Sequence, residues 1–138
     1  MALVADASAT LALALDEDEA LYGEAVIDAI AADEVFVPAL FWFEIRNALL
    51  MSETRKRFTP ERTDQLIADL HALPIVVDAQ PRWEATIGLA RQHHITVYDA
   101  AYLELAQRQA VSLATIDEAL VKAARRASLT LFKATTRK

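Results

Sequence analysis

Short apolar segments alternate with longer segments of helical pattern along this chain, and that alternation most constrains the fold. The longer segments repeat apolar residues at the spacing of an α-helix. Strands so short and so apolar are typical of a parallel sheet that is buried on both faces. We therefore predict an α/β fold in which a parallel sheet of about five strands carries helices on both faces. The expected strands are residues 3–5, 35–37, 75–77, 111–115 and 129–132.

Helices are expected in the segments that separate these strands. Thr59 and Pro60 mark one helix start, because Thr is a good N-cap and Pro is favoured at the first helical position. The acidic run 16–19 suits an exposed turn or a helix start. No linker or repeat interrupts the pattern, so residues 1–138 are expected to form one domain, long enough to bury a core. The expected helices are residues 7–15, 20–32, 40–51, 60–72, 82–93, 97–106 and 118–126.

The composition excludes several kinds of site. The chain has no cysteine, so disulfides, thiolate zinc sites and thiol nucleophiles are impossible. Its two glycines, Gly23 and Gly88, are too few for a phosphate-binding loop or a dinucleotide fingerprint. No apolar run approaches the ~20 residues of a membrane span, and no basic region precedes Asp6 as in a signal peptide. We therefore expect a cytoplasmic protein with no membrane partner.

The charge is distributed unevenly along the chain, whose formal net charge is −6. Residues 1–45 carry ten acidic side chains and no Lys or Arg. Residues 46–138 carry ten acidic and fourteen basic side chains, which gives a local charge of +4. Such asymmetry indicates a charged binding face. The candidates for holding the phosphates of a nucleic acid are Arg55, Lys56, Arg57 and Arg62, although a solvated junction between a helix and a loop explains this basic stretch equally well.

Three aspartates lie where the expected sheet would bind a ligand. Asp6 and Asp117 each follow a strand, and Asp99 begins a helix after residues 95–97. In open α/β sheets, ligands bind outside the carboxyl ends of the strands, so these three side chains are expected along one edge. Each aspartate could instead serve as the N-cap of the helix that follows it.

Glu44 is a fourth candidate for the same edge of the sheet. It lies in a helical segment with apolar neighbours on almost every side, and a carboxylate buried there without a partner would be costly. Two like charges 4 Å apart repel by ~4 kcal/mol at an effective dielectric constant of 20. Four converging carboxylates would therefore need a cation, and ligation by oxygen alone favours Mg²⁺ or Mn²⁺. Such a site suits hydrolysis of a phosphodiester bond.

Three other chemistries compete with this hypothesis. Asp78 after the third strand and Lys133 in the last one would suit a phosphate-accepting receiver, but Asp6 is followed by Ala7 and not by a second acid. A histidine metal pair at His93 and His94 is unfavourable, because adjacent side chains on a helix do not face each other. We interpret both, and His71, as residues at helix ends. The chain has no G-x-S-x-G elbow for a serine hydrolase.

Four segments together resemble the PIN-domain ribonucleases, and among them the VapC-type toxins of toxin–antitoxin pairs. They are residues 4–8, 38–49, 98–106 and 113–117, which follow in order at fitting spacings. The resemblance implies the sheet order 3-2-1-4-5, with one or two Mg²⁺ or Mn²⁺ ions at the edge. It implies Asp6 and Asp99 as direct metal ligands, and Glu44 and Asp117 as completing the shell or ordering the attacking water. Supporting positions are Ser8, Asn47 and Thr115.

The resemblance also implies a function and partners. The function would be a metal-dependent endoribonuclease, the toxin component of a type II toxin–antitoxin system, acting on an RNA substrate. The partners would be a second copy of the chain and an antitoxin protein that lays a segment across the acidic groove. The alternative is a catalytically inactive PIN-like module that binds RNA or protein without cutting.

Overall fold

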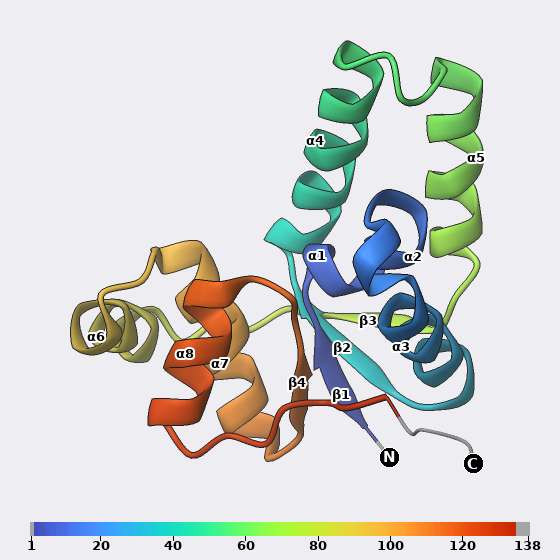
Figure 1. Cartoon of the computed structure of the whole chain (residues 1–138). Helices are drawn as coiled ribbons and strands as arrows, with labels where there is room; N and C mark the ends of the chain where they lie inside the picture. The colour runs from blue at the N-terminus through green and yellow to red at the C-terminus, as the bar shows by residue number, and fades with distance from the viewer. Residues whose placement is uncertain (1, 135–138) are drawn as a thin grey trace.

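The computed structural model describes residues 2–134 and contains a four-stranded parallel sheet (Figure 1). The strands lie in the order β3-β2-β1-β4, and each neighbouring pair is parallel. The predicted fold class is confirmed. The strands are β1 (Leu3–Ala5), β2 (Val35–Pro38), β3 (Ile75–Asp78) and β4 (Ser112–Ala114).

The predicted fifth strand over residues 129–132 is reduced to a single parallel bridge between Leu113 and Leu131. Two backbone bonds hold it: Leu113 N–H donates to Thr130 O at 3.0 Å, and Phe132 N–H donates to Leu113 O at 2.8 Å. β4 has only three residues and therefore offers a short edge for pairing. The segment still lies beside β4, which is the place that the expected order gives the fifth strand.

Helices cover both faces of the sheet (Figure 1). α7 packs against β1, β2 and β4, with α6 and α8 beside it, whereas α1, α2 and α3 lie on the other side. α4 and α5 form a hairpin that projects beyond the carboxyl ends of the strands (Figure 1). The helices are α1 (Ala7–Thr10), α2 (Ala12–Leu15), the 3₁₀ turn η1 (Glu17–Glu19), α3 (Ala20–Ala32), α4 (Leu40–Thr54), α5 (Pro60–His71), α6 (Trp83–His93), α7 (Val97–Gln109) and α8 (Glu118–Arg126).

Most helix boundaries agree with the sequence patterns. Thr59 caps α5 as predicted, because its side chain accepts a hydrogen bond from the Arg62 N–H at 3.2 Å. The continuous helix expected over residues 7–15 is wrong, since the chain turns at Leu11 and forms α1 and α2. This turn brings α2 into close contact with α3 near Gly23, a tertiary approach that a local pattern does not encode. α4 continues to Thr54, three residues beyond its predicted end.

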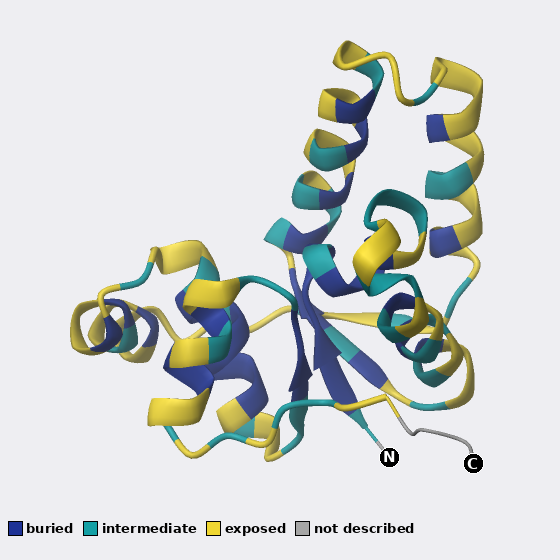
Figure 2. Ribbon diagram, viewed as in Figure 1, coloured by how far each residue is buried: buried dark blue, intermediate teal, exposed yellow. Residues whose placement is uncertain are grey.

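The core lies between the sheet and the helices on both faces (Figure 2). β1 is fully buried, which accounts for its uniformly apolar sequence. α4 buries Phe41, Ile45 and Leu49, four residues apart on one face, and leaves Phe43 and Leu50 exposed on the other. In residues 2–134, no helix is long and apolar enough to span a bilayer.

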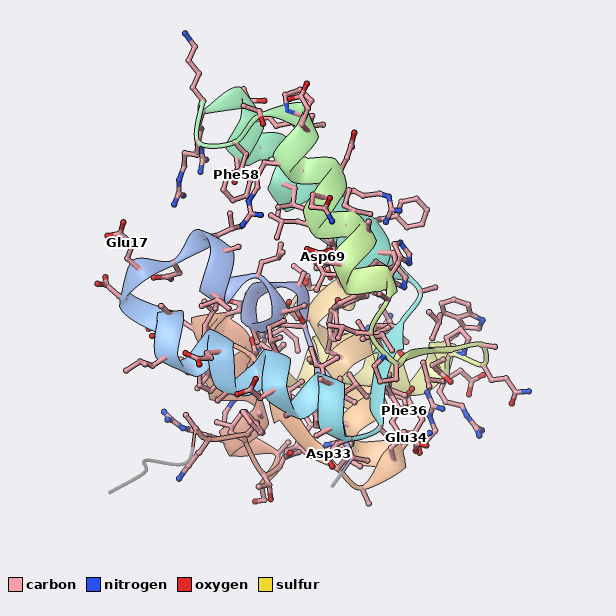
Figure 3. All side chains as sticks on the ribbon, turned by 90° about the vertical axis from the view of Figure 1, so that its right-hand side faces the viewer. Glu17, Asp33, Glu34, Phe36, Phe58 and Asp69 are labelled. Carbon is pink, nitrogen blue, oxygen red and sulfur yellow. The ribbon has the colours of Figure 1, made fainter. Side chains whose placement is uncertain are left out.

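The acidic residues of the N-terminal third contribute to the outer side of the molecule around α3. Glu17 and Asp33 lie at opposite ends of α3 on this side (Figure 3). α6, α7 and α8 lie on the opposite side of the sheet (Figure 1). The acidic run 16–19 nevertheless has a basic residue near it, because Arg57 binds the carbonyl of Leu15.

Candidate active site

The order of the strands creates a crevice between β1 and β4. From β1 the chain proceeds outward to β2 and β3, and it then returns to place β4 on the other side of β1. The segments that follow β1 and β4 therefore leave toward opposite faces of the sheet. Open α/β sheets bind ligands beyond the carboxyl ends of two such strands. Ala5 pairs with Ala114, so Asp6 and Thr115 leave the sheet side by side.

Asp6 is held at the bottom of this crevice by three hydrogen bonds. Its Oδ1 accepts bonds from the Ser8 hydroxyl at 2.7 Å and from the Ala9 N–H at 2.8 Å, and its Oδ2 accepts a bond from the Thr115 hydroxyl. Asp6 therefore caps α1, as one of the two interpretations predicted. The side chain is almost inaccessible, and burial raises the pKa of Asp6 to about 6, with a further contribution from Glu44.

Two hydroxyl groups connect Asp6 to the start of α8. Ser8 Oγ accepts a bond from the Ile116 N–H at 3.1 Å, and Thr115 Oγ1 accepts one from the Asp117 N–H at 3.0 Å. Asp117 caps α8, because its Oδ1 accepts a bond from the Ala119 N–H at 3.2 Å. Ser8 and Thr115 thus position both the Asp6 carboxylate and the backbone that carries Asp117.

Asp99 is not the N-cap of α7, so that interpretation is wrong. The N-cap is Thr96, which has an extended backbone conformation. Its Oγ1 accepts a hydrogen bond from the Asp99 N–H at 3.0 Å. The Asp99 carboxylate is therefore available to the crevice. Burial raises the pKa of Asp99 to about 6, and the neighbouring Asp117 carboxylate adds to this rise. Asp6 and Glu44 also raise the pKa of Asp99, so all three other carboxylates affect it.

Glu44 reaches the crevice from α4 and is held by Tyr102. The Tyr102 hydroxyl donates to Glu44 Oε1 at 2.6 Å, and Tyr102 is only 1% exposed. Burial raises the pKa of Glu44, the bond from Tyr102 opposes this shift, and Asp117 adds to it. Tyr102 falls on the apolar face of α7, and its helical spacing indicates only a core position. A buried tyrosine, however, needs a partner for its hydroxyl, and that requirement was the available signal.

The donor atoms at this crevice fit a hard divalent cation. Within residues 2–134, no three His, Cys, Asp or Glu side chains form a group that could hold a metal ion as they stand. Asp6 and Glu44 accept bonds from neighbouring hydroxyl groups, as described above. The pKa values of Asp6, Glu44 and Asp99 are nevertheless raised in part by neighbouring carboxylates, which is the repulsion that a cation would relieve. An oxygen-only donor set is the one that Mg²⁺ and Mn²⁺ prefer.

Comparison with known proteins identifies the family. A model of the PIN domain matches residues 3–126. The chain belongs to the PIN-domain family. It is 31% identical over 126 residues to Ribonuclease VapC3 of Pyrobaculum aerophilum, a match that covers 88% of this chain and 94% of that protein. The resemblance seen in the sequence, to VapC-type members of the family, is confirmed.

Solved structures share the fold of this PIN domain. The crystal structure of PAE2754 from Pyrobaculum aerophilum matches with a TM-score of 0.67 and 22% identity, over 89% of this chain and 79% of that one. The crystal structure of FitAcB from Neisseria gonorrhoeae matches with a TM-score of 0.65 and 15% identity, over 95% and 96% of the two chains.

Asn47, the third supporting position, lies beside the crevice of the PIN domain. With Glu44 it lines a hollow of about 410 Å³ between α4 and the helices α1 and α2. Ser8 and Ile116 line the same hollow. Asn47 is thus near the carboxylates, and its role stays a prediction.

The basic stretch is distant from the carboxylates of the PIN domain. Arg55 to Arg57 occupy the tip of the α4–α5 hairpin (Figure 1), roughly 16 Å from Glu44 along the helix axis at 1.5 Å per residue. Arg57 Nη2 donates to the Leu15 carbonyl at 2.8 Å, which ties the tip to α2. Arg62 lines a separate hollow between α2 and α5. A contact of these residues with RNA stays a prediction.

Asp78 does not join the carboxylates, and the receiver hypothesis loses its central residue. Asp78 ends β3, the outer strand of the sheet, and accepts two bonds from Arg108, at 3.2 and 2.8 Å. The same guanidinium binds Glu104 at 2.9 Å. Arg108 lowers the pKa of Asp78, so this carboxylate is a stable structural partner.

The histidines lie at helix ends, as predicted. His93 is the last residue of α6, and His94 follows it with a positive φ of 53°. His71 ends α5 and stacks on Trp42, with ring centroids 3.7 Å apart.

Proposed function

We propose that this protein is a metal-dependent endoribonuclease, the toxin component of a type II toxin–antitoxin system, with one PIN-like nuclease domain over residues 1–138. The observation that carries the proposal is the convergence of Asp6, Glu44, Asp99 and Asp117 at the carboxyl ends of β1 and β4. Membership of the PIN-domain family and the 31% identity to a protein named a ribonuclease support it.

The carboxylates and the hydroxyl groups that hold them have different roles in the proposed reaction. When bound, Mg²⁺ or Mn²⁺ lowers the pKa of a coordinated water and stabilises the charged oxygens of the phosphodiester. Asp6 and Asp99 would hold the ion directly, and Glu44 and Asp117 would complete the shell or orient the attacking water. Thr115 and Ser8 fix the Asp6 carboxylate, and Tyr102 fixes Glu44.

Removal of divalent ions tests the proposal. Cleavage of a single-stranded RNA in Mg²⁺ or Mn²⁺ is expected to fall at least about 100-fold in excess EDTA, because several kcal/mol of transition-state stabilisation are lost. Gel analysis of end-labelled RNA measures the rate, and added Mn²⁺ should restore it. Undiminished cleavage in EDTA contradicts the metal mechanism. Binding of RNA without cleavage in either ion, and no gain in thermal stability from Mn²⁺, would favour the inactive binding module.

We infer two protein partners, an antitoxin and a second copy of the chain. The resemblance to VapC-type toxins supports the antitoxin. For the second copy, the exposed side chains of Trp83, Ile87, Val97 and Tyr98 supply an apolar face next to a hollow of about 410 Å³. An apolar patch of this kind is typical of a protein interface. Arg82 and Glu84 flank Trp83, so a two-fold copy could pair opposite charges, whereas the acidic N-terminal side would repel its copy.

Measurement of the solution mass tests the homodimer. Light scattering is expected to give twice the chain mass of 15.2 kDa for the wild type and a single chain for Trp83→Glu. Leu21→Glu is the control, because Leu21 is also highly exposed but lies on α3, away from this face. A monomeric wild type at micromolar concentration, or equal dissociation by both variants, contradicts this interface.

A further inference from the structure

Three hollows lie near the four carboxylates, and they differ in the side chains that line them. The first includes Glu44 and lies between α1, α2 and α4, and the second includes Tyr98 and the ends of β2 and β3. Neither has Lys, Arg or His among its described lining residues. The third has a volume of about 490 Å³, includes Asp117, and lies between the end of α6 and the start of α8. Its lining carries the nitrogen side chains of His93, His94, Lys122 and Arg126 beside the carboxylates of Asp117 and Glu118.

Arg126 is fixed at the wall of the third hollow. Its Nη2 donates to the backbone carbonyl of His93 at 3.1 Å, which anchors the guanidinium at the carboxyl end of α6. A guanidinium has five N–H donors, and this bond uses one of them. An anchored guanidinium loses little conformational freedom when it binds a phosphate in the forked geometry that Arg favours.

Lys122 lies one helical turn before Arg126 on the same face of α8. Its Nζ is 3.0 Å from Glu118 Oε1, and the two side chains are 60% and 82% exposed. A pair so open to water contributes little to stability, so the Lys122 ammonium can move to another anion at little cost. His94 is also exposed, and its left-handed backbone ends α6 at this hollow.

We propose that the third hollow is a subsite for the phosphodiester backbone of the RNA substrate, with Lys122, Arg126 and His94 as its phosphate-binding groups. The inference rests on the proposed function. RNA must approach a protein of net charge −6 at a crevice that holds four carboxylates, so binding requires cations close to the reacting phosphate. Asp117 lines both the crevice and this hollow, so a strand crossing the carboxylates passes directly onto these cations. The tip of the α4–α5 hairpin is farther away, and Arg57 there already binds the Leu15 carbonyl.

Binding of a labelled single-stranded oligoribonucleotide, measured by fluorescence anisotropy over a series of KCl concentrations, tests the subsite. Asp99→Asn serves as the background in every case, so that cleavage of the RNA during the measurement is roughly 10³-fold slower. Adding Lys122→Ala and Arg126→Ala is expected to weaken binding about 10-fold or more and to reduce the slope of log K against log salt by about 1.4, roughly 0.7 for each lost phosphate contact. Arg125→Ala is the matched control, because Arg125 adjoins Arg126 on α8 but does not line the hollow. It should change the affinity less than twofold.

The possible results separate the subsite from the proposed function. Unchanged affinity and salt slope in the double variant, with the parent chain still cleaving RNA, overturns the subsite and leaves the nuclease standing. A loss that appears only in Arg55→Ala/Lys56→Ala overturns it in favour of the hairpin tip. If the parent chain neither binds nor cleaves RNA, the proposed function fails and the subsite with it. Circular dichroism and the melting temperature confirm that each variant is folded, and Lys122→Gln/Arg126→Gln repeats the test without shortening the side chains to Ala.

Discussion

Replacement of Asp99 by Asn is expected to lower the rate of Mg²⁺- or Mn²⁺-dependent RNA cleavage roughly 10³-fold, because several kcal/mol of transition-state stabilisation depend on the ion and each 1.36 kcal/mol is a factor of ten. Asp99 is the carboxylate whose pKa responds to all three of the others. The Asn side chain has nearly the same shape but no charge, so the fold is expected to persist. A rate equal to that of the wild type would contradict the assignment.

The same variant should stabilise the metal-free protein near neutral pH. The pKa of Asp99 is about 6 in the folded protein and 3.8 in its reference state. Between these values the folded state binds more protons than the unfolded state, so the free energy of unfolding falls as the pH rises from about 4 to about 6. Asp99→Asn removes this loss and should gain about 1 kcal/mol at pH 7, a value reduced for solvent screening because Asp99 is only half-buried.

Urea unfolding in EDTA at pH 4, 5, 6 and 7 measures this effect. Asp64→Asn is the control for a change of one charge, because Asp64 is exposed on α5. It should leave both the cleavage rate and the pH dependence unchanged. If Asp99→Asn keeps the wild-type pH dependence, the repulsion among the carboxylates is weaker than the structure indicates.

Gly23→Ala is expected to destabilise the protein by about 3 kcal/mol or more, the upper part of the usual cost of overpacking. A Cβ at this position would lie 2.3 Å from the Leu13 N and 2.9 Å from the Ala12 carbonyl carbon. Both are backbone atoms, so no side chain can rotate away and α2 must separate from α3. Helix propensity alone favours Ala over Gly by about 1 kcal/mol, so steric contact and propensity predict opposite signs.

Gly88→Ala is the matched control for this prediction. Gly88 also lies inside a helix, α6, but nothing is within 4 Å of a Cβ built there. The substitution is expected to stabilise the protein by about 0.5–1 kcal/mol. Urea denaturation measures the free energy of unfolding of both variants. A stabilising Gly23→Ala would show that α2 and α3 are not in close contact.

The sequence predicted the elements well, because each depends on local pattern. Hydrophobic periodicity located α3 and α8, and Thr59 with Pro60 located the start of α5. The fifth strand was overestimated because strand formation depends on the length of its partner, β4. The break at Leu11 was missed because it arises from contact between α2 and α3, which lies outside any single segment.

The candidate site was predicted less completely, because it depends on tertiary contacts. Strand ends indicated Asp6 and Asp117, but only the path of α4 brings Glu44 to the same crevice. Thr96 and Asp99 are both suitable caps three residues apart, and the backbone conformation at Thr96 decides between them. Tyr102 falls on the apolar face of α7, and a periodic pattern does not show where a hydroxyl points.

The pairing of β1 with β4 joins the first strand of the chain to the last one in the sheet. A chain that has been synthesised only as far as residue 98 contains Asp6 and Glu44 but lacks Asp99 and Asp117. Asp6 also lacks its bond from Thr115 at that stage. The four candidate carboxylates therefore come together only after residue 117 has emerged and β4 has joined the sheet. Under the proposed function, this order of assembly would keep an unfinished chain from cutting the RNA that encodes it.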